Sequence, residues 1–166
     1  MEVVIGKTEV LLLLVIVGGS EIGLAKYFPW LALYLDLPLV LVIYIGWYSR
    51  PAKAALCGSA FGLLADAFLR ILLGLNGVSK TTIGFVTAYL NRWVLIGGFF
   101  PRLFVISSLT LLDNLIVFCM LELLSQPVRE GFGYHALIRG VVTGLAGVVI
   151  FQVYDWLKLP RREFRA

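Results

Sequence analysis

Charged residues are scarce in this chain, and the side chains that most catalytic and metal sites need are scarcer still. Only 14% of the 166 residues are charged, and there are one histidine and two cysteines. Ordinary soluble domains are about 25% charged and about 45–50% apolar, whereas 60% of this chain is hydrophobic. A soluble fold of this size could not cover that much apolar surface, but a lipid bilayer accepts it. The composition therefore argues against a soluble domain and predicts an integral membrane protein.

The few residues with chemical reactivity do not form a recognisable motif. The chain contains no H-E-x-x-H, no phosphate-binding lysine loop and no G-x-S-x-G. Its single histidine, His135, falls at the start of an apolar run, where a polar residue at a membrane interface is expected. Cys57 and Cys119 lie inside apolar runs and have no metal-ligand spacing, so we interpret them as small buried hydrophobic residues. We therefore predict that the protein is not an enzyme and binds no cofactor and no metal.

The chain divides into long apolar runs separated by turns that contain Gly, Pro or charged residues. A spanning helix needs about 20 mainly apolar residues, so about six spans with short loops would use nearly the whole sequence. The first run has neither the basic start nor the small-residue cleavage site of a signal peptide, and we expect it to be retained. We predict an all-α, polytopic membrane helix bundle that forms a single integral membrane domain over residues 1–166. The predicted spans are residues 10–28, 37–48, 54–73, 78–94, 103–124 and 136–157.

The basic residues are unevenly divided between the two sides of the predicted bundle. Nine of the 14 Lys and Arg residues fall on the side that holds both termini. The positive-inside rule then places both termini in the cytoplasm, and it explains the net charge of +4 better than nucleic-acid binding does. The other side holds Lys26, Arg70, Lys80, Arg129 and Arg139.

Three carboxylates, Glu21, Asp66 and Asp113, lie deep inside apolar runs. A charge at mid-bilayer costs roughly 2.5–3.5 kcal/mol on insertion scales, so such residues are candidates for function. Arg70 is one helical turn from Asp66 and could pair with it, whereas Glu21 and Asp113 have no evident cation at comparable depth. The carboxylates either form an ion or proton path or make interhelical hydrogen bonds that hold the bundle together. We favour the second reading.

A strip of small residues precedes one of these carboxylates, in the pattern Ala54-x-x-x-Gly58-x-x-x-Gly62-x-x-x-Asp66. Residues four apart advance by about 40° around a helix, so the four positions form one narrow face. Such a face lets a second helix approach closely. The second helix belongs either to the same bundle or to a partner, and the spacing does not separate these alternatives. We take Ala54, Gly58, Gly62 and Asp66 as the predicted partner-binding residues, and we expect a similar face at Gly140, Gly144 and Gly147 to pack internally.

The stretch from residue 36 to residue 95 resembles MreD, a family of rod shape-determining membrane proteins of bacteria. The resemblance rests on the order and spacing of several short motifs, because each one alone is weak. One departure from the family pattern is the bulky segment with Arg70 after Asp66, which argues against an open polar pocket there. In order, the motifs are the Pro-led apolar run Leu37–Tyr48, the basic turn Arg50-Pro-Ala-Lys53, Gly58-x-x-x-Gly62-Leu-Leu-x-Asp66, Leu73-Gly-Leu-Asn76, and Thr82-Ile-Gly-Phe-Val-Thr-Ala-Tyr-Leu90.

The resemblance implies a non-enzymatic membrane scaffold of the bacterial cell-wall elongation complex, located in the cytoplasmic membrane. The implied partner is an MreC-like protein with one membrane span, and through it the MreB filament and the wall-synthesising glycosyltransferase and transpeptidase. The family is also similar in fold to the substrate-binding subunits of energy-coupling-factor vitamin transporters. Such a binding subunit is the alternative function, and a lipid-modifying membrane enzyme is a third.

Overall fold

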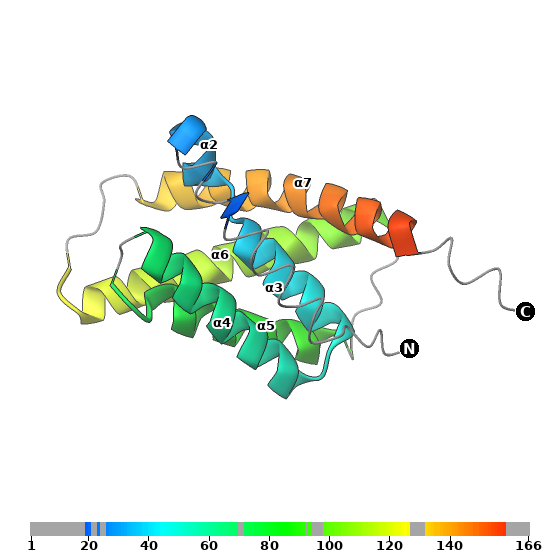
Figure 1. The fold of residues 1–166 in the computed structure, drawn as a ribbon, viewed down its shortest axis with the longest axis horizontal. Helices are drawn as coiled ribbons and strands as arrows, with labels where there is room; N and C mark the ends of the chain where they lie inside the picture. Colours follow the sequence, from blue (N-terminus) through cyan, green and yellow to red (C-terminus); the bar gives the residue numbers. More distant parts are fainter. Residues whose placement is uncertain are drawn as a thin grey trace, which may run out of the picture.

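The computed structural model describes residues 19–20, 23, 26–69, 72–91, 93, 98–126 and 132–158, and within these ranges the chain is helical and has no strand. The all-α prediction is therefore confirmed for this part of the chain. In Figure 1, α3, α5 and α7 run in one direction through the bundle and α4 and α6 run in the other. The helices are α2 Pro29–Tyr34, α3 Leu37–Tyr48, α4 Pro51–Leu69, α5 Leu75–Leu90, α6 Phe99–Leu123 and α7 Phe132–Lys158.

Five of the six predicted spans correspond to helices, and their boundaries differ by no more than about one turn. The helix α3 begins and ends where the sequence predicts. The helix α4 starts earlier, at Pro51, because proline is well suited to the first turn of a helix. Gly74 ends the turn before α5 with a φ of 102°, a backbone conformation that glycine adopts without strain. Most of the predicted span 10–28 lies outside the described residues.

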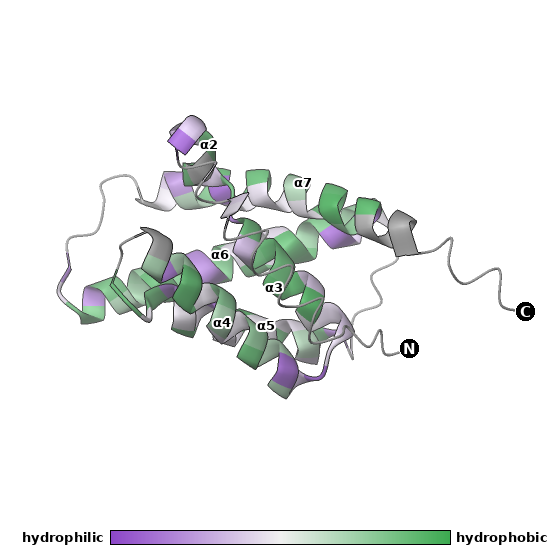
Figure 2. Cartoon of the chain, in the orientation of Figure 1, coloured by the Kyte–Doolittle hydropathy of each residue, from purple (hydrophilic) through white to green (hydrophobic). Residues whose placement is uncertain are grey.

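Two described helices, Phe99–Leu123 and the Gly133–Val153 part of α7, are long and apolar enough to cross a membrane. In their most apolar stretches only 28% and 33% of the residues are buried inside the protein, whereas the core helix of a soluble protein is mostly buried. Figure 2 shows hydrophobic residues along most of each helix, with hydrophilic residues at isolated positions and near helix ends. Large exposed apolar side chains repeat every four residues on one face of α7: Leu137, Val141, Leu145, Val149 and Val153.

The helix α3 is the central element of the bundle. It contacts α4, α5, α6 and α7, and every residue from Pro38 to Trp47 is buried. A helix that is apolar on all sides is stable only when other elements surround it. At about 1.5 Å per residue, its 12 residues extend about 18 Å, which is well short of a bilayer core of about 30 Å.

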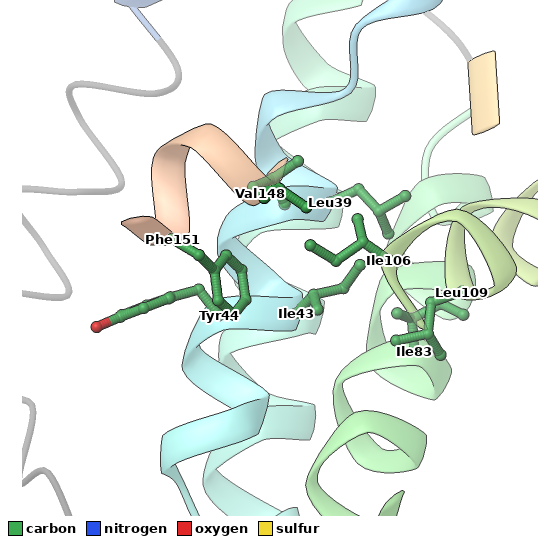
Figure 3. Packing of buried hydrophobic residues seen from close by; sticks show 9 residues of the cluster. Leu39, Ile43, Tyr44, Ile83, Ile106, Leu109, Val148 and Phe151 are labelled. Atoms are coloured by element: carbon green, nitrogen blue, oxygen red, sulfur yellow. The ribbon is translucent and has the colours of Figure 1, made fainter. Parts of the chain in front are cut away.

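An apolar cluster joins α3 to three of its neighbours (Figure 3). Tyr44 of α3 lies edge-on to Phe151 of α7, with ring centroids 4.9 Å apart. Ile83 of α5 and Leu109 of α6 belong to the same cluster. These side chains form the apolar layer of the bundle. The remaining members of this layer are Leu39, Val40, Ile43, Ile106 and Val148.

Candidate functional site

Four charged side chains from four separate parts of the chain meet inside the bundle. Lys80 Nζ of α5 lies 3.0 Å from Asp36 Oδ2, at the start of α3, and 4.0 Å from Asp113 Oδ2 of α6. Arg139 Nη2 of α7 forms an ion pair with the same Asp36 oxygen. Asp36, Lys80 and Asp113 are at most 2% exposed, whereas the side chain of Arg139 is 30% exposed. We call these four residues the charge cluster, and their formal charges cancel.

Asp36 is the centre of the charge cluster because it acts both locally and over a long range. Locally it is the N-cap of α3, and its Oδ1 accepts a hydrogen bond of 2.9 Å from the backbone N–H of Leu39. An aspartate at this position satisfies a backbone donor that the helix leaves unpaired. Its other oxygen accepts from Lys80 and Arg139. One side chain therefore fixes the start of α3 and holds two cations.

Amides and hydroxyls complete the polar surroundings of the cations and of Asp113. Asn76 Oδ1, one turn before Lys80 on α5, accepts from Lys80 Nζ at 3.1 Å. The Ser79 hydroxyl donates to Asp113 Oδ1, and Asn114 Oδ1 accepts from Arg139 Nη1 at 3.4 Å. Lys80 thus has two close acceptors and a more distant carboxylate. Such pairing is what allows charged groups to remain buried.

A hydroxyl connects the segment before α3 to α7. Thr143 Oγ1 accepts from the backbone N–H of Asp36 at 3.3 Å and donates to the backbone oxygen of Tyr34 at 3.0 Å. The Tyr34 hydroxyl lies 3.1 Å from His135 Nδ1, and the two rings are stacked. Figure 1 shows α2 lying against the beginning of α7. These bonds attach α2 and the start of α3 to α7.

Asp66 occupies a second polar site, at the junction of α4 and α5. Its carboxylate accepts from the backbone N–H groups of Gly74 at 2.9 Å, Asn76 at 3.1 Å and Gly77 at 3.2 Å. It also accepts from Asn76 Nδ2 at 2.8 Å. A carboxylate at a helix N-terminus satisfies free N–H groups and interacts favourably with the helix dipole. Asn76 therefore links Asp66 to Lys80, while the predicted pairing with Arg70 lies outside the described residues.

The strip Ala54, Gly58 and Gly62 is filled by α5 of the same chain. A Cβ atom at Gly58 would lie 2.2 Å from the backbone oxygen of Lys80, and one at Gly62 would lie 2.3 Å from that of Asn76. Ala54 and Asp66 are fully buried. A partner helix at Ala54, Gly58, Gly62 and Asp66 would have to displace α5, so the structure gives this predicted partner-binding strip an internal contact. The close approach was expected, but the helix that fills the strip comes from within the bundle.

The second glycine face packs internally, as expected. A Cβ atom at Gly144 would lie 2.3 Å from Ser107 Oγ, and one at Gly147 would lie 3.0 Å from the Ile106 side chain. Gly140 faces Leu111. All three contacts are with α6, so this face is the contact surface between α6 and α7.

Sequence reasoning identified Asp113 but missed most of the residues around it. The expectation that Asp113 has no cation nearby is wrong, because Lys80 Nζ lies 4.0 Å away. The charge distribution of the sequence places Lys80 and Arg139 only on one side of the membrane, and it does not single out Asp36. Available signals were the helix-capping position of Asp36 before Leu37-Pro38 and the four-residue spacing of Asn76 and Lys80. Glu21 lies outside the described residues.

The geometry favours a role for these charges in holding the helices together. The four charged residues come from the same elements, α3, α5, α6 and α7, that form the apolar layer, and each ion pair among them joins two of these elements. Within the described ranges, no three His, Cys, Asp or Glu side chains group as metal ligands. No family model, no curated protein and no solved structure matches this chain.

Proposed function

We propose that this protein is a membrane scaffold of the bacterial cell-wall elongation complex. It resides in the cytoplasmic membrane with both termini in the cytoplasm, and it supports rod shape through association with an MreC-like, single-span partner. The apolar outer faces of α6 and α7 support the membrane location. The ordered motifs between residues 36 and 95 support the family.

The observation that carries the proposal is that the motif residues form one packing unit. Gly58 and Gly62 allow the backbones of α4 and α5 to touch. Asp66 then closes the turn between them by binding Gly74, Asn76 and Gly77. The residues that carry the resemblance to MreD therefore build a closely packed helical hairpin, and this suits a protein that acts by association.

The buried charges also support a structural role and so favour a scaffold. Asp36, Lys80, Asp113 and Arg139 interact with one another, and they join helices of a single chain. Because both glycine faces are filled from within the chain, the proposed association uses other surfaces.

Depletion of the protein in its native cells tests this proposal. We expect the cells to lose their rod shape and become round as wall insertion along the cylinder fails, and a plasmid copy of the wild-type gene should restore the rods. An empty plasmid serves as the control. If depleted cells keep their length and width over several generations, the proposed role is wrong.

A further inference from the structure

Each member of the charge cluster comes from a different helix or helix start. Asp36 precedes α3, and the other three residues belong to α5, α6 and α7. The closest ion pairs join distant parts of the chain, because Asp36 binds Lys80 at a separation of 44 residues and Arg139 at a separation of 103 residues. The four formal charges cancel when all four elements are in place, and the absence of any one element leaves a net charge of one unit.

We propose that the charge cluster is an electrostatic interlock, which makes the docking of the α2–α3 junction depend on α5, α6 and α7 together. Burying an unpaired charge is strongly unfavourable, while a buried group that is paired and hydrogen-bonded is tolerated. An arrangement that lacks one helix leaves an odd charge in the interior. The interlock thus disfavours partly assembled bundles, and it does so whether or not the scaffold function is correct.

The contacts predict an order of importance within the interlock. Asp36 accepts hydrogen bonds from both Lys80 and Arg139, so its loss leaves two cations without their shared anion. Asp113 Oδ2 lies 4.0 Å from Lys80 Nζ and accepts no hydrogen bond within the described part of the chain. The interlock is therefore centred on Asp36, and Asp113 balances the total charge from a greater distance.

The net charge of the cluster distinguishes the interlock from simple packing of the same side chains, because variants can change that charge or restore it. Lys80→Met leaves one excess negative charge, and Asp113→Asn leaves one excess positive charge. The double variant Lys80→Met, Asp113→Asn is again neutral. If the four residues act through charge balance, the double variant should be more stable than Lys80→Met alone. If each residue acts independently, the losses should add.

The experiment compares the thermal unfolding of the full-length protein and its variants in one detergent. We expect Lys80→Met to lower the midpoint by about 10 °C and the second substitution to recover roughly half of that loss or more. Thr82→Met, on the exposed side of α5, is the matched control and should leave the midpoint unchanged.

A second pair keeps the test decisive if Lys80→Met cannot be isolated as folded protein. Asp36→Asn is then compared with the neutral double variant Asp36→Asn, Arg139→Gln. Recovery in the double variant supports the interlock. Additive losses in the pair that can be measured overturn it.

Discussion

Lys80 Nζ lies 3.0 Å from Asp36 Oδ2, although 44 residues separate them in the sequence. Both side chains are almost completely buried, at 1% and 2% exposure. The pair fixes α5 against the start of α3, and Arg139 adds α7 at the same oxygen. The charge cluster is therefore organised around one carboxylate.

Removing the charge of Asp36 should destabilise the protein more than removing the charge of Asp113. Asp36→Asn breaks two ion pairs and weakens the cap of α3, so we expect a loss of about 3–5 kcal/mol in the free energy of unfolding. Asp113→Asn loses only a 4.0 Å ion pair and keeps an oxygen for the Ser79 hydroxyl. Chemical unfolding of both purified variants checks the order. An equal loss, or a larger loss for Asp113→Asn, would contradict the central place of Asp36.

Asp66 should stabilise the start of α5 mainly through the hydrogen bonds that its oxygens accept, and only partly through its negative charge. Asp66→Ala leaves three backbone N–H groups and the Asn76 amide without their acceptor, and we expect a loss of about 2–4 kcal/mol. Asp66→Asn keeps one acceptor oxygen and should lose less. Hydrogen exchange at the amides of Gly74, Asn76 and Gly77 measures the effect directly. Unchanged protection of these amides in Asp66→Ala would show that the cap is not needed.

Even one methyl group should disturb the contact between α4 and α5. The Cβ of Gly62→Ala would lie 2.3 Å from the backbone oxygen of Asn76, and a backbone atom cannot rotate away as a side chain can. We expect a loss of about 1–3 kcal/mol, which is typical of overpacking. Gly133→Ala is the control, because outside the adjacent backbone of its own helix no atom lies within 4 Å of its added Cβ. If both variants melt at the same temperature, the two helices do not touch as described.

The hydroxyl of Thr143 should contribute to the attachment of α2 and α3. Thr143→Val keeps the shape of the side chain but removes the bonds to the Asp36 N–H and the Tyr34 oxygen. We expect a loss of about 1–3 kcal/mol from these buried groups. Thr82→Val is the control, since Thr82 is exposed and bonds only within its own helix. A loss no greater than that of the control would mean that α2 is held mainly by other contacts.

The sequence predicts the helices of this protein better than it predicts their partners. Pro38 and the turn at Ser49-Arg50-Pro51 define α3, because proline suits the first turn of a helix and the turn stops the apolar run. The glycine spacing likewise indicates a close helix contact. The spacing cannot tell which helix fills the strip, because a small residue accepts any helix of suitable shape.

The charge cluster was harder to predict for a related physical reason. A lysine near the start of an apolar helix can extend its long side chain to a membrane surface, and hydropathy places Lys80 there. Only the packing of α3 against α5 turns that side chain toward Asp36. The pairing is thus a property of the assembled bundle, and neither helix contains it alone.

Purification of the full-length protein from its native membranes, with identification of the proteins that accompany it, tests the proposed scaffold role most directly. We predict that a single-span, MreC-like protein is recovered with it, together with wall-synthesising enzymes, and that an unrelated polytopic protein purified in parallel recovers none of them. Recovery of transporter ATPase subunits and a bound vitamin in their place would contradict the scaffold role and favour a substrate-binding subunit.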